Sequence, residues 1–289
     1  MKTAIVTDSA AYIDPALVAQ YQITVVPITV IFNDHPYLEN VEIDSPTFFE
    51  KLRTEKALPT TAQITMGQMK ATYDRLADAG FDEIISIHLS SGITGFFDNL
   101  QMFIREYTRI PVYAFDSKIA SAGEANMALL AGRLVAKGMS AEAIIPLLQR
   151  LRDSTDVFFM VDDLNHLLRT GRISNSSAII GNLLRIKPLL TFNDQGQIIV
   201  AGKERTVKRA FSKIMTHFHL TIAAAQTNYP LRATVIDAND PAGSEQWVAA
   251  VHHQFPNIPV DVSHLGPVIS VHTGEKTMGL LWSLDWQKM

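Results

Sequence analysis

Three segments in the N-terminal half place polar side chains directly after a short apolar run. Asp8-Ser9 and Asp116-Ser117 each follow such a run, and Ser90-Ser91-Gly92 follows a third. Because the carboxyl ends of parallel strands meet at one edge of a sheet, these hydroxyls and carboxylates are expected to gather at a ligand site. The alternative is structural, because Asp and Ser are also the preferred N-caps of the helices expected next.

The segment Ser90-Ser91-Gly92-Ile93-Thr94-Gly95 carries the most chemistry of the three. Its two glycines allow a tight turn and a close approach of the backbone to a ligand. A helix beginning at Gly95 would direct free N–H groups and a partial positive charge outward, which favours a carboxylate or a phosphate. A serine nucleophile is the competing interpretation, but the sequence lacks a G-x-S-x-G elbow.

Three further polar groups could contribute to a site. Pro59-Thr60-Thr61-Ala62-Gln63-Ile64-Thr65 immediately precedes a predicted helix and is also explained as a loop with a capping threonine. Arg169 and Arg172 flank a glycine turn, which indicates either a helix end or a docking point for a phosphate or an acidic partner. His272 is expected at the end of an apolar strand beside Gly274, as a ligand contact or as a structural residue.

Apolar runs of strand length alternate with helical periodicity along the first half, which predicts α/β architecture with a mostly parallel sheet. The expected strands are residues 4–7, 23–32 (interrupted by Pro27), 83–88 and 112–115, and the expected helices begin at Pro15 and span 45–54, 67–79, 95–107, 120–137 and 140–152. These segments are assigned to an N-terminal α/β domain of residues 1–157.

The second half, residues 158–289, is predicted to be an α+β domain with a mixed or antiparallel sheet. Its expected strands are 158–161, 187–192, 197–201, 232–236, 260–263 and 278–283, and its expected helices are 164–169, 174–184, 206–220 and 247–255. Asn193-Asp194-Gln195-Gly196 is a hairpin turn signal between two of these strands.

Composition excludes several classes of function. The chain has 289 residues, 47% of them apolar and 19% charged, which is enough apolar material for a full core and excludes global disorder. A net charge of −4 gives no electrostatic footprint for nucleic acid or an anionic membrane. Without cysteine there is no disulfide, thiolate nucleophile, thiolate zinc site or iron–sulfur cluster.

No signal peptide and no apolar run of about 18 residues is visible, so we interpret the chain as a cytoplasmic protein without a membrane span. Metal sites are not expected. His217 and His219 face apart on a helix, His252-His253 is no better, and Asp162-Asp163 has no further ligands nearby. Gly274-Glu275-Lys276-Thr277 has the wrong spacing for a P-loop.

Taken in order, these motifs resemble those of the DegV family of bacterial fatty-acid-binding proteins. The matching segments run nearly end to end: Thr7-Asp8-Ser9-Ala10-Ala11 with Asp14, Ile23-Thr24-Val25-Val26-Pro27, Pro59-Thr60-Thr61-Ala62-Gln63, Ser90 to Gly95, Asp116-Ser117, Leu164 to Ser174 continued by Leu184-Arg185-Ile186-Lys187-Pro188, and His272-Thr273-Gly274. No single motif is specific; their shared order along the whole chain is the strong signal.

The resemblance implies two α/β domains with a long-chain fatty acid buried between them, and no cofactor. It places carboxylate-holding hydroxyls at Thr61 and Thr94, with His272 in the same hydrogen-bond network. The neighbouring Ser90, Ser91 and Gly95 complete the expected carboxylate loop, with Asp8, Ser9, Asp116 and Ser117 at its edge.

The resemblance also implies a carrier rather than an enzyme. A family member presents its fatty acid to a separate ATP-dependent kinase, related to dihydroxyacetone kinases, which forms an acyl phosphate. Arg172 and Arg205 match basic positions associated with the phosphorylated head group or with docking of that kinase. Transient contact with a membrane is compatible with this role.

The chain departs from the family pattern at a few positions. Ala62 stands where serine is common, Thr94 replaces a serine, and Thr170 replaces the first of two glycines. Glu275-Lys276 replaces a Pro-Gly pair and brings charge close to the expected mouth of the site.

Two alternatives follow from the residues alone. One is a serine esterase that uses Ser90 or Ser91, with His272 as base and Asp8 or Asp116 orienting it. The other is a binding module for a different small anion, such as a phosphorylated metabolite.

Overall fold

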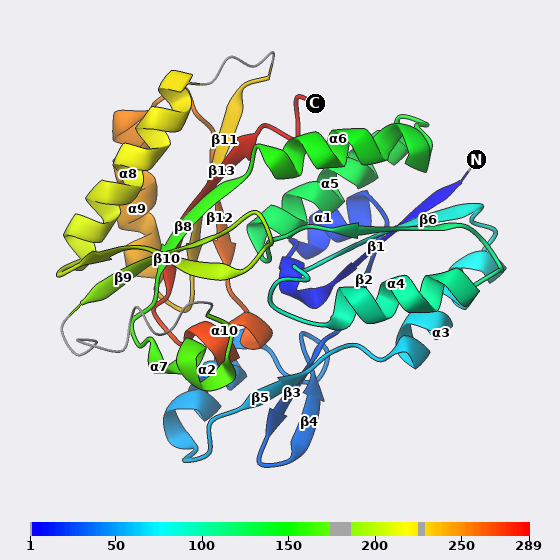
Figure 1. Cartoon of the computed structure of the whole chain (residues 1–289), viewed down its shortest axis with the longest axis horizontal. Coiled ribbons are helices and arrows are strands. Elements are labelled where there is room, and N and C mark those ends of the chain that lie inside the picture. The colour runs from blue at the N-terminus through cyan, green and yellow to red at the C-terminus, as the bar shows by residue number, and fades with distance from the viewer. Residues whose placement is uncertain (1, 174–185, 225–228) are drawn as a thin grey trace.

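The computed structural model describes residues 2–173, 186–224 and 229–289. Within these ranges the chain forms a parallel sheet, a mixed sheet and a small antiparallel sheet, with helices packed around them (Figure 1). This confirms the predicted α/β class with one parallel and one mixed sheet. The predicted helix over residues 174–184 lies outside the described residues.

The parallel sheet has the strand order β2-β1-β6-β7, formed by β2 (Ile23–Val26), β1 (Thr3–Asp8), β6 (Glu83–His88) and β7 (Val112–Asp116). The two central strands are buried along their whole length, as expected for a parallel sheet covered on both faces. Figure 1 shows α5 (Ala122–Ala136) and α6 (Ala141–Asp153) on one face, and α3 (Met66–Asp78) and α4 (Phe96–Glu106) on the other.

The mixed sheet has the order β10-β9-β8-β13-β11-β12. Its strands are β8 (Asp156–Met160), β9 (Lys187–Phe192), β10 (Ile198–Glu204), β11 (Leu231–Asp237), β12 (Val260–His264) and β13 (Met278–Leu284). Only the β11–β12 pair is parallel among the described pairings of this sheet. The β9–β10 hairpin forms where the sequence predicts it.

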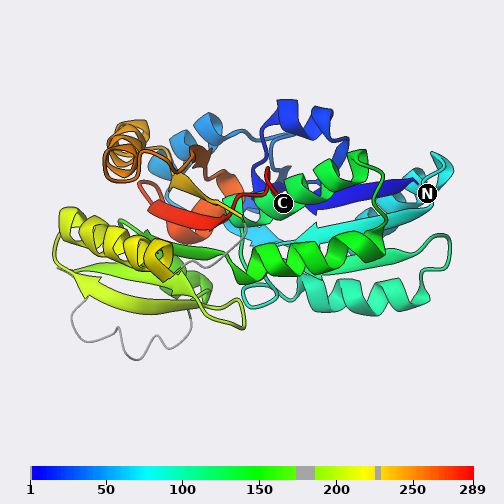
Figure 2. The ribbon, with the colours of Figure 1, turned by 90° about the horizontal axis from the view of Figure 1, so that it is seen from above.

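The two faces of the mixed sheet are both apolar but have different neighbours. Met278, Leu280 and Trp282 pack with side chains of α8 (Val207–Ala224) and α9 (Pro241–Gln254), which Figure 2 shows at one end of the molecule. Gly279 and Leu281, which alternate with them on β13, line a cavity on the opposite face. The period-2 geometry of a strand thus directs one face to the core and the other to the cavity.

The small sheet, β4 (His35–Leu38), β3 (Thr29–Phe32) and β5 (Thr60–Ala62), is where the sequence-based expectation was wrong. Residues 59–65 were expected to be a loop with a capping threonine. Thr65 does cap α3, but residues 60–62 pair antiparallel with β3 and form a strand instead of a loop. Pro27 does divide the apolar run 23–32 into β2 and β3, as predicted. The remaining short elements are η1 (Ser9–Ala11), α1 (Pro15–Gln20), α2 (Ser45–Thr54), α7 (Asn165–Thr170) and α10 (Pro267–Thr273).

The position of His272 was also predicted wrongly. It lies on α10, not at the end of a strand. The β-branched residues of this segment favour a strand, but Pro267 stands at the first helical turn after Gly266, which fits a helix start. The boundary between domains at residue 157 stays a prediction.

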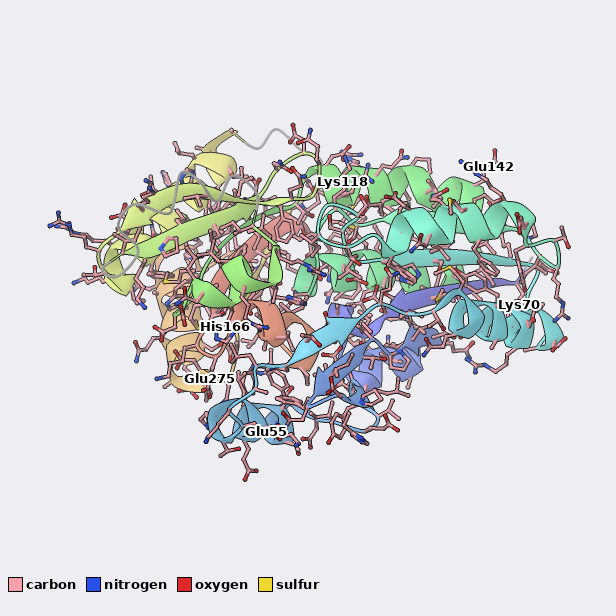
Figure 3. All side chains as sticks on the ribbon, turned by 60° about the horizontal axis from the view of Figure 1, so that its bottom comes forward. Glu55, Lys70, Lys118, Glu142, His166 and Glu275 are labelled. Atoms are coloured by element: carbon pink, nitrogen blue, oxygen red, sulfur yellow. The ribbon has the colours of Figure 1, made fainter. Side chains whose placement is uncertain are left out.

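The turn of the β9–β10 hairpin contacts the loops after β6 and β7. Ser90 Oγ donates a hydrogen bond of 2.7 Å to the Gly196 carbonyl, and Lys118 Nζ donates one of 2.7 Å to the Asp194 carbonyl. Figure 3 labels Lys118 at this junction. A Cβ atom on Gly92 would overlap the backbone of Gly196, so the close approach of the two turns requires glycine.

Gly92→Ala is therefore expected to lower the free energy of unfolding by about 2 kcal/mol, the usual cost of forcing an extra carbon into a packed contact. Gly95→Ala is the matched control, because its added carbon meets no atom within 4 Å. Urea unfolding of both variants measures the difference. Equal stability of the two variants would show that the Gly92–Gly196 approach is unimportant.

Candidate functional site

A cavity lies between the mixed sheet and the carboxyl edge of the parallel sheet. It has an empty volume of about 930 Å³, part of it open to solvent. The mixed sheet contributes Val157, Phe159 and Leu281 to its wall, and Leu89 and Ile119 come from the loops after β6 and β7. Most of the lining is apolar, which suits a hydrocarbon ligand.

The cavity brings together several of the residues predicted for a site. Thr61, Thr94, Arg172 and His272 all line it, although they lie on four separate segments of the chain. A polar group set in an otherwise apolar wall is the usual arrangement for orienting a ligand.

Thr61 and His272 contact each other directly. Thr61 is placed by the pairing of β5 with β3, where it lies opposite Val30. Its Oγ1 is 2.9 Å from Nε2 of His272, which α10 carries. His272 Nδ1 is buried and has no partner among the described residues.

His272 is held neutral. Burial lowers its pKa to about 3, and the positive charges of Arg172 and Arg169 act in the same direction. If Nδ1 carries the proton, that N–H is left for a ligand; if Nε2 carries it, the Thr61 hydroxyl is left instead. Either tautomer therefore leaves one neutral donor for an anionic group.

Thr94 and Arg172 are fixed by backbone contacts. Thr94 Oγ1 accepts a bond of 3.3 Å from the Phe96 N–H at the start of α4, which leaves its hydroxyl hydrogen free of that bond. Arg172 Nε donates to the Ile93 carbonyl at 3.1 Å, and Nη1 donates to the Thr170 carbonyl at 2.6 Å. The guanidinium is thereby tied to the same loop that carries Thr94.

The helix α10 is anchored by a buried carboxyl that the sequence analysis did not single out. Glu39 Oε1 accepts bonds from the Val268 N–H at 2.7 Å and from the Tyr12 hydroxyl at 3.1 Å. Tyr12 in turn accepts from the Ile269 N–H at 3.0 Å. Burial raises the pKa of Glu39 to about 7 and that of Tyr12 well above its usual value. No spacing in the sequence signals this role, because Glu39 meets α10 only in the folded chain.

The polar residues at the strand ends do not line the cavity. Asp8 accepts from the Ala10 and Leu89 N–H groups, and Ser9 Oγ accepts from the Ile28 N–H. Asp116 accepts from both the N–H and the hydroxyl of Ser91.

The hydrogen bonds of these strand-end residues stabilise the loops that form part of the cavity wall. Ser117 Oγ donates to the Ile119 carbonyl, and Gly95 is the N-cap residue of α4. Arg205 follows β10, is exposed and lies outside the cavity lining.

Neither serine predicted as a nucleophile contacts His272. Ser90 Oγ bonds to Gly196 and Ser91 Oγ to Asp116, whereas the Nε2 atom of His272 faces Thr61. This geometry does not favour the esterase interpretation.

A serine–histidine–aspartate chain does occur elsewhere. Ser86 Oγ lies 2.7 Å from Nε2 of His88, whose Nδ1 lies 3.0 Å from Asp8 Oδ2. All three side chains are buried, and Tyr73 donates to Ser86 at 2.7 Å. These three residues lie on β1 and β6 and are covered by Tyr73 of α3 and Phe96 of α4, so the triad is closed to a substrate.

Within the described ranges, no cluster of three or more histidine or acidic side chains is arranged to hold a metal ion. No helix in those ranges has the length and apolarity needed to cross a bilayer.

Comparison with known proteins places this geometry in a family. Residues 2–285 match the family model described as "Uncharacterised protein, DegV family". A DegV domain-containing protein of Halalkalibacterium halodurans is 39% identical over 284 residues, covering 98% of this chain and 99% of that protein.

Two solved structures resemble the whole fold. One is described as DegV, a fatty acid binding protein from Bacillus subtilis, with a TM-score of 0.90, 37% identity, and coverage of 98% of this chain and 99% of that one. The other is a fatty acid binding DegV family protein from Streptococcus agalactiae, with a TM-score of 0.91, 30% identity and the same coverage of each chain.

The anchoring of α10 predicts a pH dependence of stability. Between about pH 4.5 and 7 the unfolded chain releases the Glu39 proton while the folded chain keeps it, so the free energy of unfolding falls as pH rises. Glu39→Gln retains an acceptor for Val268 and Tyr12 but removes this titration. Across this pH range the free energy of unfolding of the variant should therefore fall by roughly 3 kcal/mol less than that of the parent.

Chemical denaturation at several pH values from 4 to 8 measures the effect, with Glu50→Gln on the exposed side of α2 as control. A Glu39→Gln profile parallel to that of the parent and the control would contradict the role given to this carboxyl.

Proposed function

This chain belongs to the DegV family, and we propose that it binds a long-chain fatty acid non-covalently in the cavity between its parallel and mixed sheets. The observation that carries the proposal is an apolar cavity whose polar side chains include the contacting pair Thr61 and His272. The description of two similar solved structures as fatty acid binding proteins supports it.

The residues that line the cavity indicate what the tail and the head group of a fatty acid each contribute to binding. Burying hydrocarbon contributes about 0.8 kcal/mol per methylene, so a sixteen-carbon tail supplies roughly 12 kcal/mol before the costs of association. A carboxylate moved out of water costs several kcal/mol unless donors satisfy it. Thr94 and the hydrogen-bonded pair of Thr61 and neutral His272 each supply a donor, and Arg172 supplies a positive charge. The tail therefore provides affinity and the head group provides orientation.

The bound fatty acid is presented to a separate ATP-dependent kinase for acyl-phosphate formation. In that reaction a carboxylate oxygen attacks the terminal phosphorus of ATP, an acyl phosphate forms, and ADP leaves. Arg172 at the cavity and exposed Arg205 are the residues assigned to the phosphorylated head group or to kinase docking. This carrier role rests on the family resemblance, as does the cytoplasmic location that goes with it.

A different small anion is the second candidate for the same site, since neutral donors and an arginine also suit a phosphorylated metabolite. The large apolar share of the wall favours the fatty acid, because a compact polar metabolite would leave that wall facing water.

Removing either hydroxyl should weaken fatty acid binding with little change in side-chain volume. Thr61→Val and Thr94→Val are each expected to raise the Kd for palmitate about tenfold, the effect of losing a hydrogen bond to a charged group. Thr60→Val, at the exposed neighbour of Thr61, is the matched control. Native mass spectrometry and titration calorimetry measure occupancy and affinity. A parent protein that carries no fatty acid and takes none up would overturn the proposal.

The kinase role predicts a separate effect at Arg205. With a purified bacterial fatty acid kinase and ATP, Arg205→Ala should slow acyl-phosphate formation severalfold while leaving the Kd for palmitate unchanged. Lys208→Ala, also exposed and close in sequence, is the control. If both variants support the parental rate, Arg205 takes no part in docking; if even the parent yields no acyl phosphate, presentation to this kinase is wrong.

A further inference from the structure

Ser121 is an anomaly in the cavity wall. It lines the cavity immediately before α5, only 5% of its surface is exposed, and its Oγ has no hydrogen-bond partner in the described part of the chain. It also makes no side-chain capping bond to α5. Leaving a hydroxyl buried and unpaired costs free energy, so a serine here calls for an explanation other than packing.

The backbone at Ser121 is strained as well. Its φ of 57° and ψ of −138° lie in a region that residues with a side chain rarely adopt. The conformation is fixed from both sides: the Ser121 N–H donates to the Ala10 carbonyl at 2.9 Å, and the Ser121 carbonyl accepts from Ala125 at 2.9 Å. The strained backbone of Ser121 lowers the stability of the folded chain, and a glycine at this position would avoid that cost.

The N-terminus of α5 adds further donors. In a helix of fifteen residues the first N–H groups have no partner within the helix, and those of α5 begin next to the unpaired hydroxyl. Gly123, in the first turn, has no side chain, and a Cβ there would press into Ile119 and approach Leu281, two other residues of the cavity wall. The absence of a side chain keeps this turn close to the wall of the cavity.

We propose that Ser121 and the N-terminus of α5 form a second polar subsite in the acyl cavity, which binds a neutral oxygen on the chain of a hydroxylated or keto fatty acid. The proposal rests on the fatty acid binding proposed above and narrows its ligand class. The carboxylate stays with Thr61, Thr94 and His272, which lie on other segments and share no described hydrogen bond with Ser121.

The surroundings favour a neutral oxygen over a second anion. Glu124 lies in the first turn of α5, is fully buried, and accepts a bond of 3.0 Å from Thr7 Oγ1. Burial and the nearby charge of Asp8 raise the pKa of Glu124. An anion at the start of α5 would add negative charge beside these two acidic groups, whereas a hydroxyl or ketone adds none.

The test compares octadecanoic acid with its hydroxy derivatives at successive chain positions, by competition binding to the whole protein. We expect at least one positional isomer to bind about tenfold more tightly than the unsubstituted acid, because it pairs a buried hydroxyl. Ser121→Ala should abolish this preference, because it should raise the Kd of the preferred isomer relative to that of octadecanoic acid until the two are equal.

Two further variants separate the subsite from structural effects. Ser121→Gly relieves the backbone strain, so it should raise stability and also lose the preference. Thr94→Val should weaken all the acids equally and keep the preference. If no isomer is preferred, or if Ser121→Ala keeps the preference, the hydroxyl serves only a structural water and the subsite is refuted. If octadecanoic acid itself does not bind, the failure is that of the proposed function.

Discussion

The geometry of the site depends on one contact, in which the loop after β6 packs against the turn of the β9–β10 hairpin. These segments are more than 100 residues apart in sequence, yet the Ser90 hydroxyl bonds to Gly196 and the two glycine backbones leave no room for a Cβ. The loop carries Thr94 and fixes Arg172 through Ile93, while the hairpin brings Phe192 and Ile198 to the cavity wall. Any separation of the two turns would move the polar end and the apolar wall relative to each other.

The site also depends on the contact between neutral His272 and Thr61. A charged imidazole would pair with a carboxylate strongly, but burial and two arginines keep His272 neutral. The positive charge is placed instead on guanidinium groups, which stay charged at any working pH. The helix that bears His272 is held at its start by Glu39 and Tyr12. The donors of the site are therefore set by buried polar contacts that do not themselves reach the cavity.

Much of the fold follows from pattern, and the exceptions have physical causes. The strands of the parallel sheet were predicted from their apolar runs, and the β9–β10 hairpin was predicted from its turn residues. In both cases the local pattern agrees with the tertiary structure. The strand β5 has only three residues and exposed ends, so it has no readable alternation. In α10 the branched residues favour a strand while Pro267 favours a helix start, and packing decides between them.

The residues of the candidate site were less predictable from local sequence patterns than the fold. Thr61, Thr94, Arg172 and His272 were placed together by family resemblance, since no local signal joins four distant segments. Glu39 and Ser121 were missed because their roles arise from burial alone.

The apolar content of the chain has its explanation in the mixed sheet. Met278, Leu280 and Trp282 pack against α8 and α9, while Gly279 and Leu281, which alternate with them, face the cavity. A sheet with water on one face would alternate apolar and polar residues, but this one is apolar on both. An acyl chain in the cavity would complete the second face as a helix completes the first. Ligand binding and core formation then draw on the same hydrophobic free energy, so an occupied cavity stabilises the fold as the tail leaves water.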